Sequence, residues 1–195
     1  MKIIKLTVAI FCLSILAACG SSEKKTETTD ELYVSVDNMN VENLQKEIEK
    51  RESVLNQDST AMNPTRGREL IEAYVAYANN FSQYENADEY LFKAGEIAMG
   101  LNMTAESIRY FEQVYNKFPD YKRRPYSLFL KAFVLENQAG NLEEATKTYE
   151  QFLLDYPGHE MADDAEYSIK NMGKSPEELI REFEIQDSIR NAQQV

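Results

Sequence analysis

One helical unit occurs twice in the middle of this chain, and this repeat constrains the fold more than any other feature. Residues 90–119 can be laid over residues 128–157 with a constant shift of 38 and no gap. The shift brings Phe118 and Pro119 onto Tyr156 and Pro157. A fixed period of this length indicates stacked supersecondary units, each too small to bury its apolar face alone. The chain is therefore expected to be a stack of similar helical units.

Apolar spacing extends this series of helices to both sides of the repeat. The predicted helices cover, approximately, residues 41–56, 65–80, 87–101, 104–117, 124–139, 142–155 and 161–172. The helix from residue 65 is interpreted as the second half of an earlier unit, paired with the helix from residue 41. A last helix begins at Ser175, the N-cap, with Pro176 in the first helical position and Glu178 completing a capping box.

The expected fold is all-α, a short α-solenoid of helix pairs closed by a C-terminal capping helix. Residues 1–18 are assigned to a signal peptide and residues 19–39 to a flexible tether, because residues 20–31 carry no large apolar side chain. Residues 40–174 form the repeats and residues 175–195 the last helix. Residues 32–36 alternate like a short extended piece that could dock on the domain.

The first twenty residues predict a cell address. Lys2 and Lys5 precede an apolar run over residues 6–15, which is too short for a permanent membrane span of about 20 residues. The following Leu-Ala-Ala-Cys-Gly resembles a bacterial lipoprotein box, and the resemblance implies cleavage before Cys19 and lipid on its sulfur. Gly20, where inner-membrane retention would use Asp, favours the outer membrane. An ordinary secretory signal cut near Ala18 is the alternative.

Charge and residue chemistry exclude several classes of function. The formal net charge is −12, which argues against nucleic-acid binding because phosphate backbones are repelled. His159 and its neighbour Glu160 lie near Asp163 and Asp164, but the chain has one His, so a His-based zinc site is not expected. These two aspartates are expected in the first turn of a helix. No catalytic residue, metal or cofactor is predicted.

The repeat resembles the tetratricopeptide repeat. That family has a large residue and small residues in its first helix, a small and an aromatic residue in its second, and a closing proline. Here those places fall on Leu91, Ala94, Gly95, Ala98, Ser107, Phe111 and Pro119, and then on Phe129, Ala132, Ala145, Tyr149 and Pro157. Phe133 and Glu136 depart from the pattern, being larger than Gly95 and Ala98 at a shift of 38. The second helix pair is therefore expected to be spread or tilted differently.

With its aromatic-Pro junctions and lipoprotein box, the chain looks most like tetratricopeptide-repeat lipoproteins of the bacterial envelope. These include the lipoprotein subunit of the β-barrel assembly machine and the periplasmic partner of the Tol–Pal system. In this family, first helices line a groove that holds a partner peptide. By position, the resemblance implies a partner groove formed by Glu89, Phe92, Glu96, Met99, Leu130, Val134 and Asn137. The alternative is that Phe92, Leu130 and Val134 belong to the core.

Two further surfaces are candidates for partner binding. Leu179, Ile180 and Phe183 share one face of the last helix and are expected to cap the open end of the stack. Ile185 and Ile189 lie on nearly the opposite face and suggest a partner seam, or burial by a bend of the helix. The basic run at residues 122–124 is either a site for an acidic partner or a solvated loop paired with Glu residues.

The sequence thus favours a non-enzymatic, lipid-anchored adaptor that binds another envelope protein or peptide. Outer-membrane assembly or maintenance is a plausible role for it, and the domain is expected to face the periplasm rather than the outside. A structural accessory subunit with permanent oligomer contacts through the last helix is the second hypothesis. The third is a metal-dependent protein or enzyme.

Overall fold

The computed structural model describes residues 34–56 and 63–193, and the described residues form eight α-helices and no strand. Cys19 and most of the expected tether lie outside the described residues. Of the residues placed in the tether, Val36 is buried in the core. The helices are α1 (Val41–Asn56), α2 (Pro64–Asn80), α3 (Ala87–Gly100), α4 (Thr104–Lys117), α5 (Arg124–Asn137), α6 (Leu142–Asp155), α7 (Ala162–Asn171) and α8 (Pro176–Ala192).

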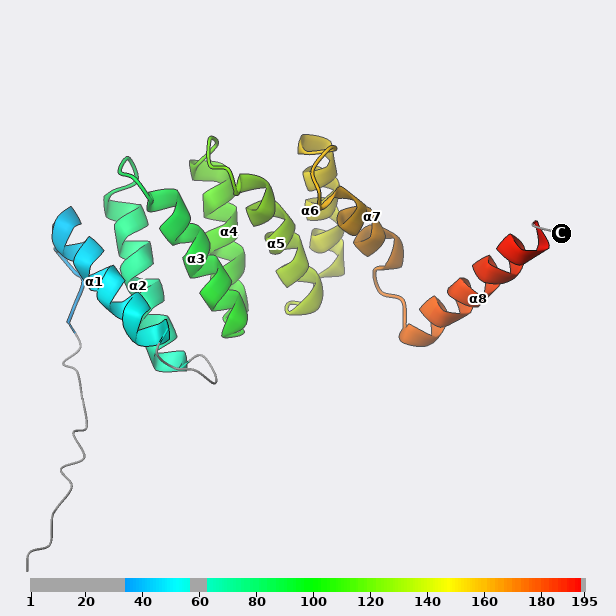
Figure 1. The fold of residues 1–195 in the computed structure, drawn as a ribbon, viewed down its shortest axis with the longest axis horizontal. Coiled ribbons are helices and arrows are strands. Elements are labelled where there is room, and N and C mark those ends of the chain that lie inside the picture. The colour runs from blue at the N-terminus through cyan, green and yellow to red at the C-terminus, as the bar shows by residue number, and fades with distance from the viewer. Residues whose placement is uncertain (1–33, 57–62, 194–195) are drawn as a thin grey trace, which may run out of the picture. The chain divides into compact units, whose positions relative to one another are not determined.

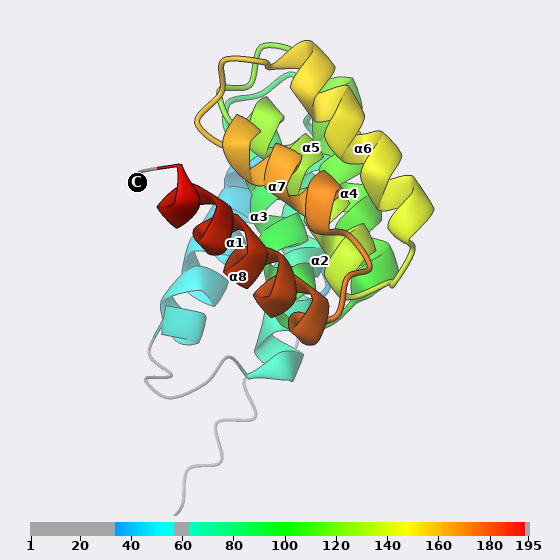
Figure 2. The ribbon, with the colours of Figure 1, turned by 90° about the vertical axis from the view of Figure 1, so that its right-hand side faces the viewer.

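The helices from α1 to α7 pack in chain order, each on the next, as a repeat architecture requires. The first helices α1, α3, α5 and α7 form one layer, and the second helices α2, α4 and α6 form another (Figures 1 and 2). The prediction of an all-α stack of helix pairs is confirmed. None of the described helices is both long and apolar enough to span a membrane.

Local sequence signals explain where several helices begin. The Asn63 side chain accepts hydrogen bonds from the backbone N–H groups of Thr65 and Arg66, at 3.0 and 3.3 Å, and Pro64 opens α2. Ser175 forms the predicted capping box, because its hydroxyl accepts from the N–H of Glu178 at 3.2 Å and the Glu178 carboxylate accepts from the Ser175 N–H at 2.7 Å. Each side-chain oxygen satisfies a helix-end donor that would otherwise lack a partner.

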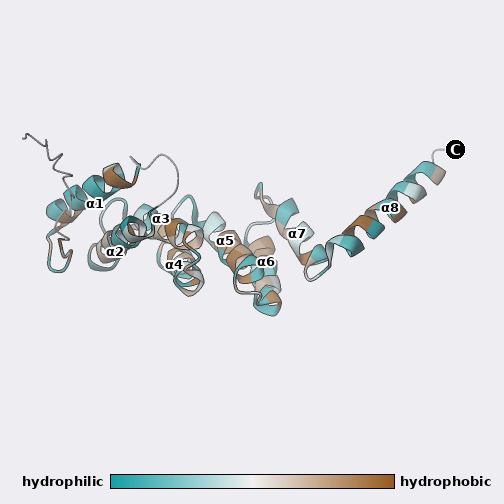
Figure 3. Cartoon of the chain, turned by 90° about the horizontal axis from the view of Figure 1, so that it is seen from below, coloured by the Kyte–Doolittle hydropathy of each residue, from teal (hydrophilic) through white to brown (hydrophobic). Residues whose placement is uncertain are grey.

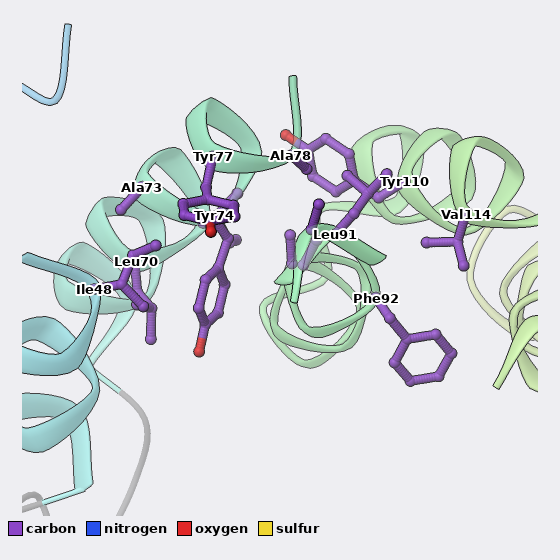
Figure 4. Close-up of a cluster of buried hydrophobic side chains, with 14 of the residues drawn as sticks. Ile48, Leu70, Ala73, Tyr74, Tyr77, Ala78, Leu91, Phe92, Tyr110 and Val114 are labelled. Atoms are coloured by element: carbon purple, nitrogen blue, oxygen red, sulfur yellow. The ribbon is translucent and has the colours of Figure 1, made fainter. Parts of the chain in front are cut away.

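Second helices share a packing register that holds each pair together. Counted from its first residue, the fourth residue of α2, α4 and α6 is small and buried: Gly67, Ser107 and Ala145. The eighth and eleventh residues are larger and buried: Ile71 and Tyr74, Phe111 and Val114, Tyr149 and Phe152. Figure 4 shows two of these side chains, Tyr74 and Val114, among buried side chains from the four helices α1 to α4.

The two central units do not have one constant shift. The second helices α4 and α6 begin 38 residues apart, but the first helices α3 and α5 begin 37 apart, because the loop at 138–141 is one residue longer than the loop at 101–103. In this longer loop Gly140 adopts a φ of +63°, which glycine tolerates. The gapless alignment was therefore wrong for the first helices.

This correction removes the expected distortion of the second pair. With a shift of 37, Gly95 corresponds to Ala132, and both are buried. Phe133 is 40% exposed and is not a member of the buried cluster that α5 and α6 share. The pairs accordingly do not need a different spread to accommodate Phe133.

Candidate protein-binding face

On α3, the four expected groove residues have different environments. Glu89, Glu96 and Met99 are half-buried, whereas Phe92 is fully buried. The Phe92 ring packs edge-on against Phe111, with centroids 5.5 Å apart, and the guanidinium of Arg123 lies 3.8 Å above it. Phe92 is thus a core residue covered by an arginine, and the core alternative replaces the groove assignment for this side chain.

Arg123 links this part of the face to the following repeat. Its guanidinium nitrogens lie 3.4 Å from Glu89 Oε1 and 2.8 Å from Glu96 Oε1. Burial alone would lower the pKa of Arg123, but Glu96 and Glu89 outweigh it and raise this pKa. The Tyr121 hydroxyl donates to Glu89 Oε2 at 2.6 Å, and burial, followed by this contact, raises the Tyr121 pKa. Two carboxylates of the face are therefore held by residues of the loop at 118–123.

Within the basic run, Arg123 is paired with Glu residues as the second interpretation expected, but neither arginine lies in a solvated loop, because both are half-buried. Besides the contacts of Arg123, the Arg124 side chain donates to the Tyr115 carbonyl and the Tyr156 hydroxyl, at 2.8 and 2.9 Å. Its guanidinium also lies 4.3 Å from the Tyr115 ring centroid. Lys122 is exposed. Both arginines connect one repeat to another, so they are not available as an open anion site.

On α5, two of the three expected groove residues belong to the packing between repeats. Val134 is fully buried in the core of the first two repeats, and half-buried Leu130 contacts this core and the core of the next repeat. Asn137 is exposed, and its amide donates to the Phe133 carbonyl at 3.0 Å. The physical reason is the one-residue shift, because one residue turns a helical position by about 100°.

The corrected register instead matches Glu89, Glu96 and Met99 with Tyr126, Phe133 and Glu136. Half-buried Tyr126 packs edge-on against His159 at 4.8 Å, and half-buried Glu136 accepts from the Tyr149 hydroxyl at 3.0 Å. Phe133 is the exposed apolar member of this set. Sequence reasoning missed it, although Pro125 in the first turn marks where α5 begins and Gly140 marks the longer loop.

Between the first helices α1 and α3 the same face has a hollow of about 310 Å³. It is lined by Glu52, Leu55, Asn56, Leu70, Tyr74, Lys93, Glu96 and Ile97. Lys93 Nζ lies 3.0 Å from Glu52 Oε1 and 5.8 Å from the Tyr74 ring centroid. Burial, followed by the hydrogen bond that Tyr74 donates to Glu52, raises the Tyr74 pKa. The hollow therefore combines an apolar floor with charged walls.

The family model for the tetratricopeptide repeat matches residues 89–121 and 126–159. Residues 89–159 therefore contain tetratricopeptide repeats. The two matches begin 37 residues apart, in agreement with the spacing of α3 and α5. No curated protein matches the chain. Tetratricopeptide repeats are typical of non-catalytic binding domains and suggest protein–protein interaction.

Beyond the repeats, the last helix does not cap the stack as expected. No side chain of α8 is buried, and Ile180 and Phe183 are 60% and 72% exposed. Ile185 and Ile189, the expected seam, are 52% and 53% exposed, so the alternative of burial by a bend does not hold. An apolar pattern indicates that a helix face is suited to burial, but it does not identify what covers that face.

The histidine cluster is built into the packing between α6 and α7. His159 Nδ1 accepts the Met161 N–H at 3.2 Å, and its ring packs edge-on against Phe152 at 5.5 Å. Asp163 and Asp164 lie in the first turn of α7, as predicted, where negative charge suits the helix dipole. Among the described residues no group of acidic, His or Cys side chains is arranged to hold a metal.

Proposed function

We propose that this protein is a lipid-anchored adaptor of the bacterial cell envelope that binds another envelope protein through its first-helix face. The first-helix face means the exposed and half-buried side chains of α1, α3 and α5 described above. It binds without chemistry of its own. The observation that carries the proposal is Phe133, a large apolar side chain that is 40% exposed on a tetratricopeptide repeat.

The chemistry of this face suits a protein segment. Phe133 offers an apolar contact. Tyr126 and Glu136, which belong to the same set of α5 positions in the corrected alignment, offer polar groups. The hollow between α1 and α3 has room for one or two side chains of an extended peptide, and Glu52, Lys93 and Glu96 add polar groups to its walls. Aromatic residues surrounded by polar groups are typical centres of binding energy at interfaces.

The proposal is tested by site-specific photocrosslinking in cells. A photoreactive phenylalanine analogue replaces Phe133 on α5 or, as the matched control, Leu154 on α6, which is 76% exposed. We expect a defined adduct with another envelope protein from position 133 and none from position 154. Identical adducts from both positions, or none from position 133, would remove the first-helix face from the proposal.

The anchor is proposed from the lipoprotein box at residues 16–20, and the outer membrane from Gly20. Mass spectrometry of the purified protein is expected to find an N-terminal Cys19 carrying acyl chains. The Cys19→Ala variant is expected to leave the membrane fraction, because several acyl chains, each contributing about 0.8 kcal/mol per buried CH₂, provide the anchorage. An unmodified Cys19 in the membrane fraction would contradict the anchor.

A second candidate is a structural accessory subunit with permanent oligomer contacts through α8. The exposure of Ile185 and Ile189 favours it. Light scattering separates the two candidates: an accessory subunit that self-associates gives a dimer or larger species that Ile185→Ser and Ile189→Ser dissociate. The adaptor gives a monomer over the same concentration range.

A further inference from the structure

Exposed apolar side chains concentrate at the C-terminal end of the chain. Ten large apolar residues of the described part are exposed, and seven of them lie between positions 142 and 189: Leu142, Leu154, Tyr167, Ile180, Phe183, Ile185 and Ile189. Four of the seven are on α8, where brown patches alternate with teal ones in Figure 3. A contiguous exposed apolar surface commonly marks an interaction site, and on α8 Leu179, Ile180 and Phe183 line one hollow.

The sequence of α8 resembles a second helix in part. Its eighth residue, Phe183, has the place that Phe111 and Tyr149 occupy in α4 and α6. Its fourth residue, however, is Leu179, where the other second helices have Gly67, Ser107 and Ala145. A leucine prevents the close approach that a small residue permits, so α8 does not close on α7 as α4 and α6 close on their partners.

The chain's own α7 is also too short to cover α8. With 10 residues, α7 is about 15 Å long, whereas the 17 residues of α8 extend over about 25 Å at 1.5 Å per residue. Even a folded-back α8 would leave Ile185 and Ile189 beyond or opposite the contact. In the structure α7 therefore leaves α8 uncovered, and its apolar side chains are open to a segment of another molecule.

The charge of this end identifies the chemistry of that molecule. Residues 142–192 contain 13 Asp and Glu against five Lys and Arg, a formal net charge of −8, whereas the whole chain has −12. On α8 itself, Leu179, Ile180 and Phe183 line a shallow hollow of about 390 Å³ whose other lining residues are Glu184 and Asp187. Asp187 pairs with Arg190 at 3.5 Å, and both side chains are well exposed, so this contact is weak.

We propose that α8 is a second docking surface, distinct from the first-helix face, for a positively charged amphipathic helix of another protein. The apolar stripe of that helix would cover Leu179, Ile180 and Phe183, and its Lys or Arg residues would meet Glu184 and Asp187. A second copy of this chain fits less well, because two ends of −8 each would repel one another.

The experiment uses the full chain and two synthetic amphipathic helical peptides, one of leucine and lysine and one of leucine and glutamate. Fluorescence anisotropy is expected to show saturable binding of the lysine peptide and none of the glutamate peptide. Ile180→Ala with Phe183→Ala should weaken this binding about tenfold, because both substitutions remove apolar area that the peptide would cover. Alanine keeps α8 helical.

Tyr84→Ala is the matched control, because Tyr84 is 55% exposed beside Glu85 and Asp88 but lies outside α8. It should leave binding unchanged, whereas Glu184→Lys with Asp187→Lys should weaken it. Equal binding of both peptides, or equal loss in Tyr84→Ala, would overturn the proposal. So would a dimer seen by light scattering that the Ile180→Ala, Phe183→Ala variant dissociates. These measurements do not involve the first-helix face. A failure of photocrosslinking at Phe133 would therefore leave the α8 proposal standing, and the reverse also holds.

Discussion

Gly95→Ala is expected to destabilise the protein, although alanine is the better helix former. A Cβ at position 95 would lie 2.7 Å from Cε1 and 2.8 Å from Cδ1 of Phe111. Non-bonded carbons prefer about 3.5–4.0 Å, so the ring and the helix must separate by roughly 1 Å. The Phe111 ring is fully buried, and the hydrogen bond from Ser107 Oγ to the Gly95 carbonyl, at 3.1 Å, holds α4 close to α3.

The magnitude follows from two opposed terms. Overpacking a core of this kind costs about 1–3 kcal/mol, and replacing glycine by alanine in a helix returns about 0.8–1.0 kcal/mol. The free energy of unfolding should therefore fall by about 1 kcal/mol, within a range of roughly 0–2. Gly100, the last residue of the same helix, has open space within 4 Å of the point where an alanine Cβ would lie, so Gly100→Ala should be neutral or slightly stabilising.

Urea unfolding followed by far-UV circular dichroism measures both variants against the parent chain. Gly95→Ala should be less stable than Gly100→Ala by about 1–2 kcal/mol, since only the Cβ at position 95 meets a buried ring. In a Phe111→Leu background the cost of Gly95→Ala should shrink, because the two sites share one contact. Equal stability of the two alanine variants would refute the close approach of α3 and α4.

Three further predictions test the corrected register and the local contacts. Val134→Ala should lower the free energy of unfolding by about 1–2 kcal/mol, because it removes buried methyl groups, whereas Phe133→Ala should change it by less than about 0.5 kcal/mol in the same urea experiment. Burial, followed by the hydrogen bond to Asp155, raises the pKa of Tyr115 from 10.0 to about 12. Its contribution to stability is therefore complete below pH 10 and lost as the pH rises towards 12; an absorbance titration should lose this late phenolate in Tyr115→Phe. Ser175→Ala should weaken the start of α8 by about 1 kcal/mol, seen as faster amide exchange in its first turn.

The sequence was sufficient to predict features that depend on neighbouring residues. The bounds of α4 and α6 match the predicted ranges, and the capping box at Ser175 is confirmed. Both depend on apolar spacing and helix-cap residues, and these signals come from residues that are close together in the sequence.

Features that depend on residues far apart in the chain were missed. Because of the extra residue at 138–141, an alignment with a shift of 38 is offset by one residue along α5, which corresponds to a rotation of about 100° around the helix. That alignment places Leu130 and Val134 in the groove, where the structure has Phe133. The position of Arg123 over Phe92 joins residues 31 apart, and no local pattern predicts it. Repeat alignment alone cannot detect such an error when the loop, not the helix, changes length.

A chain truncated after Lys174 distinguishes two arrangements of α8. In one, α8 is exposed as in this structure; in the other, it packs on the repeats as the cap that its apolar pattern suggests. A cap that buried Leu179, Ile180 and Phe183 would contribute about 1.5–3 kcal/mol for each side chain, so its removal would cost several kcal/mol. In the structure the truncation removes no buried side chain of α8, and it breaks the ion pair between Lys174 and Glu182 at 2.7 Å, a partly exposed pair of about 0–1 kcal/mol. The truncated chain should therefore unfold in urea with a free energy within about 1 kcal/mol of the full chain. A loss of several kcal/mol would show that α8 packs on the repeats, and the surface proposed for a basic partner would then be part of the core.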